Sequence, residues 1–133
     1  MEVVFLDLLD VLEIHETLVN AHGGSQGIRD LGALLSAIAQ PQSGFEGQFF
    51  HEDVYEMAAA YLFHIVKNHP FLDGNKRTSL ASALIFLDIN NIEIDAPEQS
   101  LYEITMAAAE GKAAKAAVAN YFRSSPVSRT NQM

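Results

Sequence analysis

Residues 69–78 read HPFLDGNKRT and form the most polar turn of the chain, between two apolar segments with helical spacing. The segment before the turn is expected to form a helix that Asp53 caps. This helix should end near Asn68, because Pro70 cannot continue the hydrogen-bond ladder and restricts the residue before it. The segment after the turn predicts a helix over about 76–89 that is apolar on nearly every side, which is typical of a helix at the centre of a fold.

Helical spacing recurs along the rest of the chain, and residues 41–50, PQSGFEGQFF, are expected to form a loop or short hairpin with exposed aromatic side chains. We therefore predict an all-α fold, a compact bundle of about six helices, in a single domain over residues 1–123 with a disordered tail over 124–133. The other expected helices run over about 8–22, from a cap at Asp30 to Pro41, over about 97–109, and up to about Phe122. On the central helix one face is expected to carry Leu80, Ala83, Leu84 and Leu87, while Ile85, Phe86 and Ile89 cover much of the rest.

Composition narrows the possible functions. Apolar residues make up 49% of the 133 residues, which is enough for one core. The formal net charge of −9, with only eight Lys and Arg, argues against a basic face for direct nucleic-acid binding. Disulfides and thiolate metal sites are excluded because the chain has no cysteine. It also has no apolar run of membrane-spanning length and no basic start typical of a signal peptide, so we expect a cytoplasmic protein.

The polar turn contains the parts of an anion-binding site. Gly74 permits backbone conformations that other residues avoid, and residues 75–78 open a helix whose free N–H groups and dipole attract negative charge. Lys76 and Arg77 add full positive charge at the same end. This pattern is typical of a phosphate cradle.

Two further side chains of the turn suit phosphoryl or nucleotidyl transfer. Asp73, just before the cradle, can hold Mg²⁺ while phosphate oxygens complete its coordination. His69, at the other side of the turn, can take a proton from an attacking hydroxyl at neutral pH. Each residue also has an ordinary interpretation: a helix-end histidine, a simple Asp-Gly turn, and two solvated cations. The functional hypothesis depends on their conjunction.

The turn resembles the motif of the Fic/Doc family, H-x-F-x-[DE]-[AG]-N-[GK]-R. The segments GIRDLG at 27–32 and AAAEGK at 107–112 are also similar to Doc-like sequences, as is Ile14-His15 before Gly23-Gly24, so the resemblance extends to Phe122. It implies a Fic/Doc-type helical bundle.

The resemblance also implies a role for each residue of the motif. His69 corresponds to the catalytic base, and Asp73 corresponds to the Mg²⁺ ligand. Phe71 corresponds to the anchor of the loop in the core, and residues 41–50 to the flap that aligns the target segment. The ATP phosphates would be held by Gly74, Asn75, Lys76 and Arg77, with Lys76 and Arg77 also acting in catalysis.

Two departures from the adenylylating Fic pattern, G-N-G-R-x-x-[GR]-R, point to the Doc branch. Lys76 replaces the second glycine, and Leu80 and Ala81 stand where that pattern ends, so its second arginine is missing. In the Doc branch this variant accompanies transfer of the γ-phosphate of ATP. The inhibitory pattern [ST]-x-x-x-E-[GN] is also absent, because Met106 lies four residues before Glu110.

The leading hypothesis is therefore the toxin of a type II toxin–antitoxin system. It would be a protein kinase that uses ATP and Mg²⁺ to modify a Thr or Ser hydroxyl of a translation factor such as elongation factor Tu, arresting translation. A separate, Phd-like antitoxin would control it, and neither nucleic acid nor membrane is an expected partner. The alternatives are a protein adenylyltransferase on the same scaffold and a catalytically inactive module that only binds a partner; a metal hydrolase is disfavoured because the histidines lack HExxH spacing.

Overall fold

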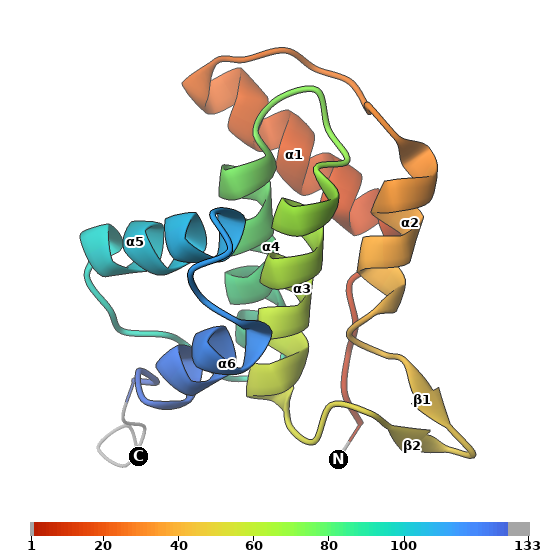
Figure 1. Ribbon diagram of the computed structural model, residues 1–133, viewed down its shortest axis with the longest axis vertical. Coiled ribbons are helices and arrows are strands. Elements are labelled where there is room, and N and C mark those ends of the chain that lie inside the picture. Colours follow the sequence, from red (N-terminus) through yellow and green to blue (C-terminus); the bar gives the residue numbers. More distant parts are fainter. Residues whose placement is uncertain (1, 128–133) are drawn as a thin grey trace.

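The computed structural model describes residues 2–127, and the described chain is a bundle of six helices with one small hairpin (Figure 1). Helices α3 and α4 pack against each other more extensively than any other pair, and the remaining helices surround them. The all-α prediction with a central motif helix is confirmed. The elements are α1 (Leu8–His22), α2 (Leu31–Ala39), β1 (Gly44–Phe45), β2 (Gln48–Phe49), α3 (Val54–Asn68), α4 (Asn75–Ile89), α5 (Glu98–Ala109) and α6 (Lys115–Arg123). In the described part of the chain, no helix is both long enough and apolar enough to cross a membrane.

Local capping explains where three of the helices begin. The carboxylates of Asp7, Asp30 and Asp53 each accept a hydrogen bond from the backbone N–H three residues later, which satisfies a donor that the helix itself leaves free. The predicted caps at Asp30 and Asp53 are therefore confirmed. Helix α3 ends at Asn68, as the proline at position 70 predicts.

Helix α4 buries a more polar face than its hydropathy predicts. Ala83 and Leu87 are buried, and Leu80 and Leu84 are partly buried and pack against the core, so the predicted apolar face points inward. On the rest of the helix Phe86 is buried, whereas Ile85 and Ile89 are exposed. A short hydroxyl side chain can bond back onto its own helix, as the Ser79 hydroxyl does by donating to the Lys76 carbonyl at 2.8 Å. The buried hydroxyls of Thr78 and Ser82 have no hydrogen-bond partner among the described residues. The buried residues of α4 are Asn75, Thr78, Ser79, Ser82, Ala83, Phe86 and Leu87.

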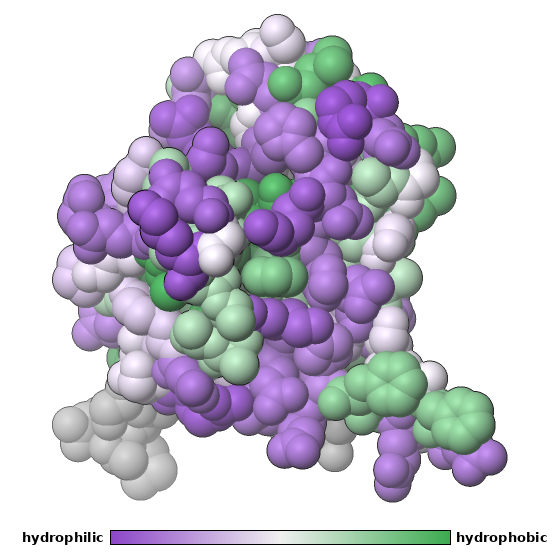
Figure 2. Space-filling view, viewed as in Figure 1, coloured by the Kyte–Doolittle hydropathy of each residue, from purple (hydrophilic) through white to green (hydrophobic). Residues whose placement is uncertain are grey.

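The segment between α2 and α3 forms the expected hairpin. Strands β1 and β2 pair antiparallel, with Gly44 opposite Phe49 and Phe45 opposite Gln48. Phe45 and Phe50 are 70% and 67% exposed, whereas the ring of Phe49 packs edge-on against Phe5 at 5.4 Å between centroids. Phe49 is still 47% exposed, so all three aromatic side chains contribute to the surface of the hairpin, which projects at the lower right of Figures 1 and 2 with hydrophobic groups on it.

The C-terminal segment is ordered beyond the predicted boundary. The backbone of Val127 donates to the Glu93 carbonyl at 2.8 Å, and Asp95 donates to the Ser125 carbonyl at 2.7 Å. The prediction of a disordered tail is therefore wrong for residues 124–127, because backbone pairing with the segment between α4 and α5 holds them. The rest of that predicted tail, 128–133, lies outside the described residues.

Candidate active site

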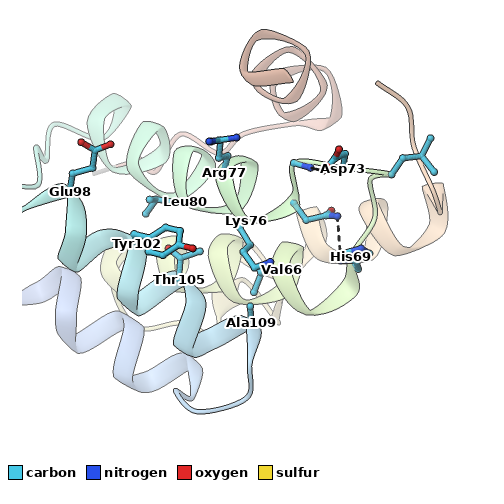
Figure 3. A pocket seen from close by; sticks show the side chains of 13 residues that line it. Val66, His69, Asp73, Lys76, Arg77, Leu80, Glu98, Tyr102, Thr105 and Ala109 are labelled. Atoms are coloured by element: carbon cyan, nitrogen blue, oxygen red, sulfur yellow. Dashed lines mark hydrogen bonds between the residues drawn. The ribbon is translucent and has the colours of Figure 1, made fainter. Parts of the chain in front are cut away.

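A cavity of about 700 Å³ lies where the end of α3, the first turn of α4 and one face of α5 meet (Figure 3). All six predicted site residues line it: His69, Asp73, Gly74, Asn75, Lys76 and Arg77. The loop between α3 and α4 brings them together, because their positions at a helix end and a helix start face the same space.

His69 occupies a strained backbone conformation at the end of α3. Its φ and ψ are 49° and 53°, in the left-handed region, although it has a side chain and precedes a proline. Such a backbone conformation lowers the stability of the folded state by about 1–3 kcal/mol and is found only where neighbouring groups hold it in place. The guanidinium of Arg29 donates to the carbonyls of His69 (2.6 Å) and Asn68 (2.9 Å) and so supports this helix end.

Asn75 fastens the loop from within. Its Oδ1 accepts from the Phe71 N–H and its Nδ2 donates to the Phe71 carbonyl, both at 3.0 Å. The same Nδ2 lies 3.3 Å from Nδ1 of His69 (Figure 3). Because the two bonds to Phe71 orient the amide, Nδ1 of His69 is the acceptor, and the proton of the neutral imidazole is assigned to Nε2. The Asn75 side chain is thus bonded within the loop, so this residue can bind an anion only through its free backbone N–H.

Phe71 is fully buried, and its ring stacks on the imidazole of His15 with centroids 3.8 Å apart. His15 is itself only 3% exposed, and its Nε2 donates to the carbonyl of Asp73 at 2.8 Å. One buried histidine of α1 therefore contacts the loop at two points, the ring of Phe71 and the carbonyl of Asp73. The predicted anchoring position of Phe71 in the core is observed.

Asp73 holds its carboxylate against the loop that follows α1. Its Oδ1 accepts from the Gly74 N–H at 3.0 Å, and its Oδ2 accepts from the Ser25 N–H at 3.2 Å. A Cβ at Gly24 would lie 2.9 Å from Oδ2 and would displace this carboxylate, and the φ of 115° at Gly24 also favours glycine there. Each carboxylate oxygen keeps a lone pair that could bind a cation.

The donor set near Asp73 fits Mg²⁺ bound together with phosphate. Among the described residues, no three His, Asp or Glu side chains gather as a metal cage. Mg²⁺ is commonly held by one or two carboxylates while substrate phosphates and waters supply the remaining ligands. A single fixed carboxylate beside a phosphate cradle matches that pattern.

Lys76 and Arg77 provide the positive charge of the cavity. Both are exposed in the first turn of α4, and within residues 2–127 neither forms an ion pair with a carboxylate. Figure 3 shows their side chains leaving the turn in different directions, so that their charges lie on two sides of it. Gly74, at φ 78°, makes the turn that opens the helix here.

Other residues at the site were not predicted. Glu98, Tyr102 and Thr105 of α5 line the far side of the cavity, and Arg29 supports the loop from the segment between α1 and α2. The three α5 residues share a helix face, but nothing in their spacing distinguishes that face from an ordinary solvated one.

Comparisons with known proteins agree with this geometry. The chain matches the Fic/DOC family over residues 5–87. It is 33% identical over 115 residues to "Protein kinase doc" of Escherichia phage P1, covering 86% of this chain and 89% of that protein. It is 39% identical over 92 residues to "Toxin Doc" of Mycolicibacterium smegmatis, covering 69% of this chain and 68% of that protein.

Proposed function

The chain belongs to the Fic/Doc family and is a Doc-type toxin, and on that premise we propose that it is a protein kinase. We propose that it transfers the γ-phosphate of ATP to a Ser or Thr hydroxyl of a translation factor resembling elongation factor Tu, in the cytoplasm. The carrying observation is that a histidine, a carboxylate held by two backbone N–H groups, and two cations without an ion-pair partner in residues 2–127 line one cavity at a helix N-terminus. This is the equipment of phosphoryl transfer, which depends mainly on positioning and on stabilising charge.

The proposed reaction is a direct displacement at the γ-phosphorus. The target oxygen forms a bond to phosphorus, the bond to the β,γ-bridging oxygen breaks, and ADP leaves. The hydroxyl proton passes to the imidazole of His69. With Nε2 protonated, the accepting atom is Nδ1, and its lone pair becomes free for the proton only when its 3.3 Å bond from the Asn75 amide is released.

The charged residues act on the transferring phosphoryl group. Negative charge spreads over its oxygens in the transition state, and Lys76, Arg77 and the free N–H groups of the first turn of α4 would stabilise it. Asn75 contributes its free backbone N–H at the helix start, whereas the Gly74 N–H is already donated to Oδ1 of Asp73, so Gly74 would serve the phosphate site through the turn that it makes. Asp73 would hold Mg²⁺, which neutralises phosphate charge when bound.

Lys76 supports γ-phosphate transfer over transfer of AMP. A glycine at this position would leave bare backbone on which an α-phosphate could rest, whereas a lysine adds bulk and charge there. We therefore expect Lys76→Gly to lower phosphate transfer on the order of tenfold or more, the scale for losing one charged donor.

The decisive experiment supplies ATP labelled at the α or the γ position, together with Mg²⁺ and purified elongation factor Tu. Label from the γ position should reach the factor, and His69→Ala should abolish this transfer while its circular dichroism stays native. Label from the α position alone would mean adenylyl transfer. No label from either position, with the factor or with whole cell extract, would indicate a binding module without this activity.

A toxin of this kind belongs to a toxin–antitoxin system and has a cognate antitoxin. We propose that this antitoxin is Phd-like and is the main control on the site. Adding it to the labelling reaction should suppress transfer in proportion to the amount of complex formed. Full transfer by a chain saturated with its antitoxin would contradict this regulation.

A further inference from the structure

Arg29 holds the backbone of His69 from outside the motif. Its Nε donates to the His69 carbonyl at 2.6 Å and its Nη2 donates to the Asn68 carbonyl at 2.9 Å. These carbonyls belong to the last turn of α3, where a helix leaves its carbonyl groups without partners of its own. The planar guanidinium fork can bind two adjacent acceptors at once, which an ammonium cannot do with the same geometry.

The position of His69 depends on more than its own conformational preference. The backbone of His69 is left-handed, although its side chain and the proline after it both disfavour that conformation. The imidazole has one side-chain partner in the described structure, the Asn75 amide at 3.3 Å, which is a long hydrogen bond. The shortest bond to His69 is therefore the one that Arg29 makes to its carbonyl.

The loop has separate backbone bonds that do not need the Arg29 side chain. The N–H groups of Arg29 and Asp30 both donate to the Pro70 carbonyl, at 2.7 and 3.0 Å, and Leu72 donates to Gly27 at 3.1 Å. These bonds, with the buried Phe71, should keep the loop folded when the guanidinium is removed. What changes is the support at Asn68 and His69.

We propose that Arg29 is a positioning residue that fixes His69 for proton acceptance, an inference that rests on the proposed function. Arg29 is not among the residues that line the cavity, so we expect it to act on His69 without contacting the nucleotide. Its loss should therefore lower kcat and leave the KM for ATP nearly unchanged. A displacement of the base by about 1 Å can cost on the order of 100-fold in rate.

The first test compares full-length Arg29→Ala and Arg29→Lys with the native chain in the γ-phosphate transfer assay. We expect kcat to fall about 10- to 100-fold in Arg29→Ala and by less in Arg29→Lys, which keeps one donor. Millimolar guanidinium ion, well below denaturing concentrations, should restore part of the rate of Arg29→Ala. The matched control is Arg123→Ala, which removes an exposed arginine paired with Asp53 on another surface and should keep the native rate.

The second test measures the environment of the His69 imidazole by NMR and needs no catalytic reaction. Imidazole signals in heteronuclear NMR spectra are assigned to His69 by their loss in His69→Ala. They should shift or broaden in Arg29→Ala and return with guanidinium, while the signals of the other four histidines stay in place. A native chain that transfers no phosphate would refute the proposed kinase, yet these spectra would still decide the role of Arg29. Unchanged His69 signals in Arg29→Ala would overturn the inference, whatever happens to the rate.

Discussion

A partly buried cluster of one lysine and two histidines outside the motif should make the fold sensitive to mild acid. The ammonium of Lys115 lies 3.2 Å from Nε2 of His51 and 3.1 Å from Nε2 of His64. Since an ammonium only donates hydrogen bonds, both Nε2 atoms must be unprotonated acceptors. Burial, and then the charge of Lys115, lower the pKa of His64 to about 4 and lower the pKa of His51 as well. Protonating either imidazole would break its bond to Lys115.

The pKa of His64 sets the direction and size of this effect. A histidine in the unfolded chain takes up its proton near pH 6.5, whereas His64 in the folded chain does so only near pH 4. Between these values the unfolded state binds more protons, so stability falls as the pH falls. At 1.36 kcal/mol per pKa unit, acidification from pH 7 to pH 5 would remove about 2 kcal/mol from the free energy of unfolding. Solvent access to the partly buried ring reduces this to about 1–2 kcal/mol.

Urea unfolding at pH 7 and pH 5 measures this loss. His64→Gln keeps a polar side chain that does not titrate. On going from pH 7 to pH 5, this variant should therefore lose about 1–2 kcal/mol less of its free energy of unfolding than the native chain loses. His22→Gln, at an exposed position near the end of α1, is the matched control and should retain the native pH dependence. Equal losses in the native chain and in His64→Gln would refute the reasoning.

Three further predictions concern the core, the metal and the hairpin. Tyr61→Phe should lower the free energy of unfolding, measured in urea, by about 2 kcal/mol, because the buried Tyr61 hydroxyl accepts from the Leu6 N–H at 2.8 Å and donates to the Leu6 carbonyl. A loss below about 0.5 kcal/mol would mean that water takes the place of the hydroxyl. Asp73→Asn should raise the Mg²⁺ concentration needed for transfer, since an amide binds this cation poorly; an unchanged requirement would assign the metal to other ligands. Replacing the exposed Phe45 and Phe50 by Ser should slow target modification without loss of stability, whereas Phe49→Ala should lower stability. Native modification by the double variant would exclude these two rings from docking.

Local sequence determined the helix ends and the residues of the candidate site. Asp30 and Asp53 cap their helices through bonds that reach only three residues along the chain, and Pro70 ends α3 by its own ring. The site residues are contained in one turn of ten positions, so a short stretch of sequence identifies them together. Such features can be recognised in any sequence because their physical cause is local.

Tertiary packing decided the rest. Ile85 and Ile89 of the apolar helix α4 are exposed while Ser79 and Ser82 are buried, because the close approach of α4 to its neighbours favours short side chains. Arg29 reaches a carbonyl 40 positions away, and residues 125–127 pair with a segment some thirty positions earlier. Hydropathy and helical spacing extend over a few turns of one element, whereas these contacts depend on how distant elements are oriented after they pack.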